Sequence, residues 1–113
     1  MADPCLFCRI ASGEIPATIV ASNAECVAFR DINPVAPTHV LVIPRTHVES
    51  LDRVDDFGTV TAMVRLAQEV TRSEGIAERG YRLVFNTNGH GGQTVYHLHL
   101  HVLGGRRMSW PPG

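Results

Sequence analysis

Histidine and leucine alternate strictly over residues 97–101, and the apolar positions continue into Val102 and Leu103. In a β-strand, alternate side chains share one face of the sheet. We therefore expect a strand over 95–103 with two different faces. One face would carry half of the chain's six histidines, about 7 Å apart, namely His97, His99 and His101. The other face would be apolar, with Leu98, Leu100 and Val102.

A second pattern, with apolar residues three and four positions apart, predicts a long amphipathic helix. The helix would run from a cap at Asp55 or Asp56 to Glu74, with Gly75 beyond its end. Its apolar side, including Phe57 and Met63, is expected to be core and to cover the leucine face of the strand. The histidine face then remains open for a site.

Shorter patterns predict the remaining elements. Asp3 and Pro4 are typical of a helix start, so a short helix is expected over 5–11, ending at Gly13. Apolar and β-branched runs between turn residues predict strands over 18–21, 26–29, 39–43 and 81–85. Five strands with hairpin-length connections and one long helix predict an α+β fold with a mostly antiparallel sheet.

The composition narrows the class of protein. A chain of 113 residues, 44% of them hydrophobic, is expected to form a single domain, residues 1–113, with its own core. The net charge is −1 and there is no basic stripe, which argues against nucleic-acid and membrane partners. With no apolar run of about 18 residues and no signal-peptide pattern, a soluble, cytoplasmic protein is expected.

The chain has three cysteines, an odd number that argues against a disulfide framework. Cys26 lies within a strand pattern and is expected to be core. Cys5 and Cys8 form a Cys-x-x-Cys pattern, which fits half of a zinc site, a redox pair, or two small buried residues on a helix. No thioredoxin-like βαβ context follows, which disfavours the redox interpretation.

The segment from Asn86 to Thr94, directly before the histidines, is rich in glycine and amide side chains. It is either an ordinary hairpin turn or a cradle in which successive N–H groups bind a phosphate or oxyanion. The adjacent histidines favour the cradle. The Gly-Lys-Ser/Thr ending of a P-loop is missing. His90, at the tip of the turn, is expected at the surface.

Three imidazoles this close together restrict one another's charge. Like charges a few ångströms apart are unfavourable, so at least one ring should be neutral near neutral pH. A neutral imidazole is a competent nucleophile, and the central His99 has a histidine on each side. The rival interpretation is metal binding, because His-x-His on a strand also suits zinc.

Several segments together point to a known family. Residues 92–101 read Gly-Gln-Thr-Val-Tyr-His-Leu-His-Leu-His, residues 29–34 read Phe-Arg-Asp-Ile-Asn-Pro, and residues 36–44 read Ala-Pro-Thr-His-Val-Leu-Val-Ile-Pro. With the ending Trp-Pro-Pro-Gly, they resemble the Hint branch of the histidine triad (HIT) superfamily. The resemblance implies a HIT fold with one long and one short helix, whose five-stranded sheets join across a homodimer. It also implies a purine nucleoside phosphoramidase, which cleaves the P–N bond of adenosine 5′-phosphoramidates and acts on aminoacyl adenylates.

The resemblance also implies roles for individual residues. His99 would attack the α-phosphorus to form a nucleotidyl-histidine intermediate, and His101 would bind the phosphate oxygens. His39 and His97 would support the site behind the nucleophile. The substrate would contact a larger set: Asn86, Gly92, Gln93 and Thr94 at the phosphate or leaving group, Asp31 at the ribose, Phe7, Phe29, Ile32 and Leu41 with Ile10 around the base, and Trp110 from the partner subunit.

Some positions depart from the common Hint pattern. Thr94 stands where the branch often has Ser, and Arg30 stands beside the ribose acid where His or an apolar residue is common, which would alter base or partner preference. The cysteine pair resembles bacterial members, in which it joins two histidines in a structural zinc site. The corresponding ligands here are Cys5, Cys8, His47 and His97. No cofactor is implied for the chemistry itself.

Other functions remain open from the sequence. A dinucleoside polyphosphate hydrolase or a nucleotidylyl transferase of the same superfamily would use the same histidines. A nucleotide-binding or scaffolding protein with little turnover would not need a nucleophile. A zinc-storage protein would use the whole histidine row, but four ligands from the cysteines, His47 and His97 would leave His99 and His101 unexplained.

Overall fold

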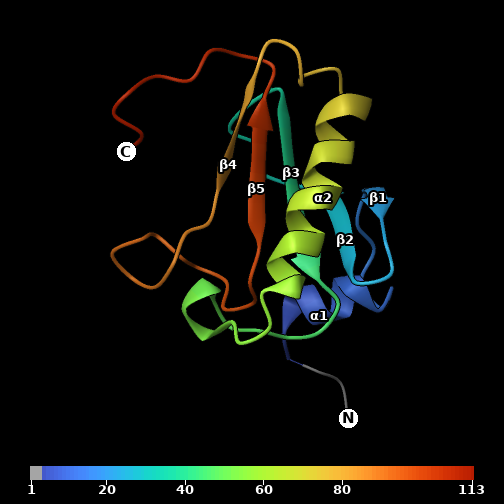
Figure 1. Cartoon of the computed structure of the whole chain (residues 1–113). Coiled ribbons are helices and arrows are strands. Elements are labelled where there is room, and N and C mark those ends of the chain that lie inside the picture. Colours follow the sequence, from blue (N-terminus) through green and yellow to red (C-terminus); the bar gives the residue numbers. More distant parts are fainter. Residues whose placement is uncertain (1–3) are drawn as a thin grey trace.

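Five antiparallel strands form a single sheet in the computed structural model, which describes residues 4–113 (Figure 1). Their order across the sheet is β1-β2-β3-β5-β4. The strands are β1 (Ile19–Ser22), β2 (Cys26–Arg30), β3 (Thr38–Pro44), β4 (Tyr81–Val84) and β5 (Leu100–Gly104). Two helices and one 3-10 turn complete the fold, namely α1 (Leu6–Ala11), α2 (Gly58–Ser73) and η1 (Leu51–Arg53). The predicted α+β class is confirmed.

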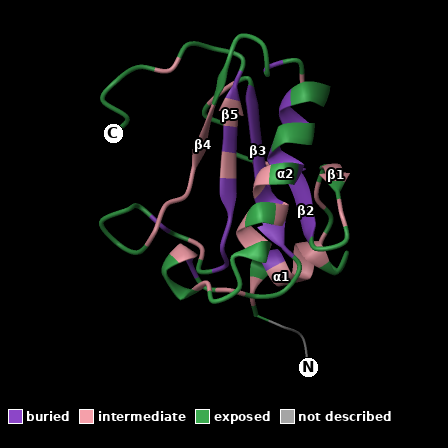
Figure 2. Ribbon diagram, viewed as in Figure 1, coloured by how far each residue is buried: buried purple, intermediate pink, exposed green. Residues whose placement is uncertain are grey.

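The central strand, β3, is buried along its whole length (Figure 2). It pairs with β2 on one side and β5 on the other. Because alternate side chains face opposite sides, Val40 and Val42 point into the cluster under α2, whereas Leu41 and Ile43 belong to a second cluster on the other face. Burial on both faces explains the nearly continuous apolar run of this segment.

The long helix α2 covers one face of the sheet (Figure 1). Its inner side packs on the leucine face of residues 98–102, as predicted, through Met63, Leu66, Ala67 and Val70. The N-cap is Phe57, without a side-chain cap hydrogen bond, so the predicted cap at Asp55 or Asp56 is wrong, although Asp56, one residue earlier, accepts the N–H of Gly58 at 2.9 Å. The expectation that Phe57 is core is wrong. Phe57 is the residue before the first turn, and it is 62% exposed.

The predicted strand over 95–103 is too long, because β5 begins only at Leu100. Its ladder with β3 stops at the pair of Val42 and Leu100, and Pro44 further along β3 has no N–H to extend it. The alternation of faces nevertheless continues beyond the ladder. Leu98 belongs to the core under α2, whereas His97 and His99 lie against Phe7 on the other side.

The short helix α1 lies at the end of the sheet where β5 begins (Figure 1). Its buried Phe7 joins a smaller apolar cluster with Val27, Phe29, Leu41 and Ile43. The predicted cap Asp3 lies outside the described residues, and the observed N-cap is Cys5, whose Sγ accepts the N–H of Cys8 at 3.4 Å. No helix within residues 4–113 is long and apolar enough to cross a membrane.

Candidate functional site

A cavity of about 910 Å³ opens on the face of the sheet opposite α2. Its walls come from α1, the ends of β2 and β3, the loop after β2, and the segment around residues 86–101. Most of the predicted substrate residues line it: Phe7, Ile10, Phe29, Asp31, Ile32, Leu41, Asn86, Gly92 and Thr94. Three histidines complete the lining, namely His39, His99 and His101.

The ring of His99 is buried and held in one orientation. Its Nδ1 lies 2.8 Å from the carbonyl oxygen of His97, and a carbonyl only accepts, so Nδ1 carries the proton. In the neutral ring, Nε2 therefore bears the lone pair. The ring also packs edge-on against Phe7, with centroids 5.2 Å apart. This arrangement fits a nucleophile fixed in one tautomer.

The tautomer of His101 follows from a chain of hydrogen bonds. The N–H of Val35 donates to Nδ1 of His39 at 3.1 Å, so the proton of neutral His39 lies on Nε2. That Nε2–H in turn donates to Nδ1 of His101 at 2.9 Å, which places the proton of His101 on Nε2. This Nε2 is buried and has no hydrogen-bond partner among the described residues. Since His101 lines the cavity, its N–H is available for a ligand oxygen.

Burial keeps His101 neutral. Together with the nearby His99 and His39, and against the opposing effect of Asp31, burial lowers the pKa of His101 to about 4. Burial also lowers the pKa of His39, although Asp31, 3.4 Å away, opposes this shift. The hydrogen-bond chain through both rings therefore exists in its neutral form at physiological pH.

The low pKa of His101 predicts a specific loss of stability in acid. Between pH 6.5 and pH 4 the unfolded chain binds a proton at His101 that the folded chain does not, so acidification favours unfolding. We expect this residue to lower the free energy of unfolding by up to about 3 kcal/mol over that range. Urea unfolding at a series of pH values should show a shallower decline for His101→Gln than for the wild type. Equal declines would contradict the assignment.

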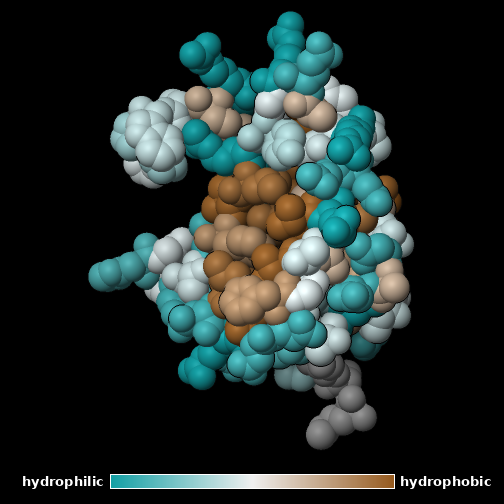
Figure 3. All heavy atoms as spheres, in the orientation of Figure 1, coloured by the Kyte–Doolittle hydropathy of each residue, from teal (hydrophilic) through white to brown (hydrophobic). Residues whose placement is uncertain are grey.

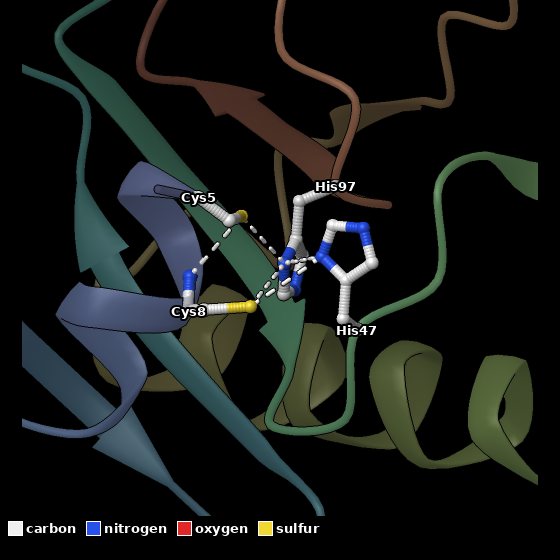
Figure 4. Close-up of side chains that lie close together, drawn as sticks. All are labelled: Cys5, Cys8, His47 and His97. Atoms are coloured by element: carbon white, nitrogen blue, oxygen red, sulfur yellow. Dashed lines mark hydrogen bonds between the residues drawn. The ribbon is translucent and has the colours of Figure 1, made fainter. Parts of the chain in front are cut away.

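A second group of side chains, from the start of α1 and from the segments after β3 and before β5, lies close together (Figure 4). Nδ1 of His97 is 3.3 Å from Sγ of Cys5, 3.5 Å from Sγ of Cys8 and 3.2 Å from Nδ1 of His47. The four candidate ligand atoms all lie within 4.8 Å of one another. Tetrahedral zinc, with bonds of about 2.0–2.3 Å, places its ligand atoms about 3.3–3.8 Å apart. These spacings therefore fit zinc.

The far side of the His97 ring supports this assignment. Its Nε2 donates to the carbonyl oxygen of Pro44 at 2.9 Å, so the lone pair of the neutral ring is on Nδ1, facing the two cysteines. A metal-binding histidine commonly has its second nitrogen held in this way. The four residues expected from the sequence as zinc ligands are thus brought together, although His97 and Cys5 are 92 positions apart.

The positions of the ring protons also argue against metal binding by the other candidate ligand group. Asp31, His39 and His101 also place three ligand atoms within 4.8 Å of one another. However, Nδ1 of His39 faces an N–H donor, so the proton must lie on Nε2, the nitrogen that a metal would need. We interpret this group as a proton-ordered hydrogen-bond chain and not as a metal site.

The glycine-rich segment forms a tight turn beside the histidines. Asn88 and Gly92 have positive φ angles of 59° and 82°, and a Cβ on Gly91 would collide with the backbone of Thr87. The side chain of Gln93 braces this turn. Its Oε1 accepts the N–H of Asn88 at 2.9 Å, and its Nε2 donates to the carbonyls of Glu49 and Val95 at 2.8 and 3.1 Å.

Comparison with known proteins identifies the family. The profile of the HIT domain matches residues 12–108. The chain belongs to the HIT domain family. It is 46% identical over 111 residues to the purine nucleoside phosphoramidase of Escherichia coli (strain K12), covering 96% of this chain and 93% of that protein.

Solved structures agree with this assignment. The crystal structure of a HIT family hydrolase from Legionella pneumophila Philadelphia 1 superposes with a TM-score of 0.93 at 53% identity, covering 96% of this chain and 99% of that one. A histidine triad protein from Clostridium difficile gives 0.92 at 38% identity, over 96% and 97% of the two chains.

Two of the predicted substrate residues of this HIT domain lie apart from its cavity. The amide group of Gln93 is engaged by the turn, and Gln93 does not line the cavity. Trp110 is 81% exposed on the C-terminal tail and does not line it either. Arg30 forms a two-point ion pair with Glu74, at 2.6 and 3.0 Å, which lowers the pKa of that carboxyl. Its guanidinium is therefore held at the end of α2.

Sequence reasoning also missed part of the site. Residues 15–18 and Val35 line the cavity, but they carry no motif and no reactive side chain. Val35 acts through its backbone N–H, which every residue except proline has, so only the folded chain distinguishes it. Cys26 is core as predicted, and burial raises the pKa of its thiol to about 11. His90 is exposed, also as predicted.

Proposed function

We propose that this HIT domain hydrolyses the P–N bond of purine nucleoside 5′-phosphoramidates, with His99 as the covalent nucleophile. The family and its relatives make the chain a hydrolase. One observation supports the specific reaction and the role of His99. The same cavity contains an imidazole whose Nε2 is unprotonated, His99, and an imidazole whose Nε2–H lacks a partner, His101.

The proposed reaction has two steps. First, Nε2 of His99 attacks the phosphorus and the P–N bond breaks, while the leaving nitrogen takes a proton from solvent, since an unprotonated amide ion is a very poor leaving group. His101 donates its Nε2–H to a phosphoryl oxygen, where negative charge develops. Second, water attacks the nucleotidyl-histidine and gives a proton back to solvent, which releases the nucleoside monophosphate and restores the lone pair on Nε2 of His99.

The rest of the cavity suits one nucleoside monophosphate unit. The aromatic and aliphatic wall of Phe7, Phe29 and Leu41 fits a planar base. The carboxylate of Asp31 is 20% exposed, and its Oδ1 already accepts the N–H of Asn33 at 2.8 Å. That orientation fits an acceptor for the ribose hydroxyls.

The charge of the cavity disfavours the dinucleoside polyphosphate alternative. A polyphosphate chain carries several negative charges, which proteins usually match with Arg, Lys or a metal ion. Among the described residues that line the cavity, Arg30 is the only Arg or Lys, and its charge is already paired with Glu74. The site therefore favours substrates with a single phosphate.

Release of AMP from adenosine 5′-phosphoramidate tests the proposal. We expect the wild-type protein to release AMP at least about tenfold faster from this substrate than from diadenosine polyphosphates at equal concentration. The reason is that the phosphoramidate brings a single phosphate into the cavity, whereas a polyphosphate brings several negative charges that no cation among the described cavity residues is free to pair. The reverse order would favour the polyphosphate hydrolase. Tight binding of AMP with no release from either substrate would favour a nucleotide-binding protein of low turnover.

We further propose that Cys5, Cys8, His47 and His97 hold a structural zinc ion. Such an ion would supply no chemistry to the reaction. It would fasten α1, which carries Phe7 and Cys8 and is capped by Cys5, to the segment that carries the proposed nucleophile.

A homodimer is also proposed. β4 is an edge strand, so part of its backbone hydrogen-bonding capacity is open to a second chain. Leu83 of β4 and Phe85 directly after it are partly buried against the core under α2, and Figure 3 shows hydrophobic side chains gathered on this face of the molecule. Trp110, away from its own cavity, is then available to approach the partner's site. Sedimentation of the purified protein tests the dimer. A cytoplasmic location stays a prediction.

A further inference from the structure

The loop between β2 and β3 contacts the histidine pair through its backbone. Val35 lies near the middle of this loop, and its side chain is 61% exposed, so packing does not anchor it. The N–H of Val35 donates to Nδ1 of His39 at 3.1 Å. This N–H requires a lone pair on Nδ1 and so places the proton of neutral His39 on Nε2, the nitrogen that also lies 3.4 Å from Oδ2 of Asp31.

The carbonyl of Val35 is held by the C-terminal segment. Nε and an Nη of Arg106 donate to this oxygen at 3.3 and 3.0 Å, and the other Nη donates to the carbonyl of Arg107 at 3.1 Å. The backbone approaches closely here. Gly105 has a φ of 87°, and a Cβ on it would lie 2.8 Å from Cβ of Pro37. Arg106 thus bridges the end of β5 and the loop from the outside.

The direction of the hydrogen-bond chain matters for the reaction. With Val35 in place, protons lie on Nε2 of both His39 and His101, and His101 presents an N–H to the cavity. If the Val35 N–H moves away, both rings can shift their protons to Nδ1, with His101 donating to His39. Nε2 of His101 then presents a lone pair, which would repel a phosphoryl oxygen.

We propose that Arg106 is a positioning residue, which holds Val35 so that its N–H fixes His39 and His101 in the tautomers that donate into the cavity. The expected effect of Arg106 on the reaction rate rests on the proposed function. The expected effect of Arg106 on the two tautomers does not, because it can be measured in the protein without substrate.

The decisive variants are Arg106→Ala and a matched control, Arg82→Ala. Arg82 also donates to a backbone carbonyl of the C-terminal tail, that of Ser109 at 2.9 Å, but it does not hydrogen-bond to Val35. Both arginines are on the outside of the molecule, so neither substitution is expected to prevent folding. Arg106→Lys, which keeps the charge but not the forked donor, should be intermediate.

Two measurements are made on each variant. Two-dimensional NMR of protein with ¹⁵N-labelled histidine reports which ring nitrogen is protonated. Turnover of adenosine 5′-phosphoramidate gives kcat and KM. For Arg106→Ala we expect a measurable population of the Nδ1–H tautomer at His39 and His101, with kcat about tenfold lower and KM changed less. Arg82→Ala should match the wild type in both measurements.

The outcomes separate the two proposals. If Arg106→Ala leaves the tautomers unchanged, the inference is overturned, whatever happens to kcat. If both arginine variants change the tautomers equally, it is overturned as well, because the effect is then general loosening of the tail. If the tautomers shift only in Arg106→Ala while the wild type releases no AMP, the positioning role stands and the proposed function fails.

Discussion

His99→Ala should lower the release of AMP from adenosine 5′-phosphoramidate by at least about 10⁴-fold, the range seen when a covalent nucleophile is removed. The reason is geometric. Nδ1 of His99 is committed to the carbonyl of His97, so Nε2 is the reactive atom, and no other ring that lines the cavity presents an unprotonated Nε2. Steady-state assays with product separation give the ratio of kcat/KM between the variant and the wild type.

The control for this experiment is His90→Ala. His90 is an exposed histidine on the adjacent turn, so its removal should leave turnover within about twofold of the wild type. Because His99 is buried, thermal unfolding of His99→Ala must also show that the domain remains folded at the assay temperature. A folded His99→Ala protein that retains more than a tenth of the activity would contradict the nucleophile assignment.

Cys5→Ser should abolish bound zinc and lower the free energy of unfolding by at least about 3 kcal/mol. The substitution is selective because the N-cap function survives. A serine hydroxyl accepts the N–H of Cys8 at least as well as the thiol does, whereas it is a poor zinc ligand. Without the ion, weaker contacts connect α1 to His97, namely the hydrogen bonds with the thiols of Cys5 and Cys8, at 3.3 and 3.5 Å, and the edge-on contact of Phe7.

Elemental analysis and urea unfolding measure the two effects. The wild type, grown with zinc and purified without chelators, should contain about one zinc ion per chain, and treatment with a strong chelator should lower its stability toward that of Cys5→Ser. Cys26→Ala is the matched control, because it removes a cysteine that is core and is not one of the four candidate ligands. It should keep its zinc. A wild type without metal, or a Cys5→Ser variant that keeps it, would contradict the site.

Much of the fold could be predicted from local patterns. The spacing of apolar residues in α2 is a direct consequence of helix geometry, and the alternation of Leu98, Leu100 and Val102 places them under that helix even where the ladder is absent. The end of the β5 ladder could not be predicted in this way. It depends on Pro44, which lies on a different strand and lacks the N–H that the ladder would need.

The candidate site, too, could be predicted only in part. The residue types show what chemistry is available, and the resemblance to the HIT superfamily placed nucleophile, phosphate partner and zinc ligands on particular residues. Neither indicated that the amide of Gln93 is occupied within its own turn, or that the guanidinium of Arg30 is held by Glu74. Each depends on a partner 44 positions away, Glu49 for Gln93 and Glu74 for Arg30, which local patterns do not reveal.

The sequence by itself determined that three histidines are grouped and that an apolar face lies opposite them, because side-chain alternation is a local property of extended chain. Only the tertiary structure decided how the histidines differ. His97 turns its lone pair to the cysteines because Pro44, 53 positions away, accepts its proton. His101 turns its N–H to the cavity because His39, 62 positions away, donates to its other nitrogen. A histidine ring takes its tautomer from its hydrogen-bond partners, and here folding brings most of those partners from distant parts of the chain.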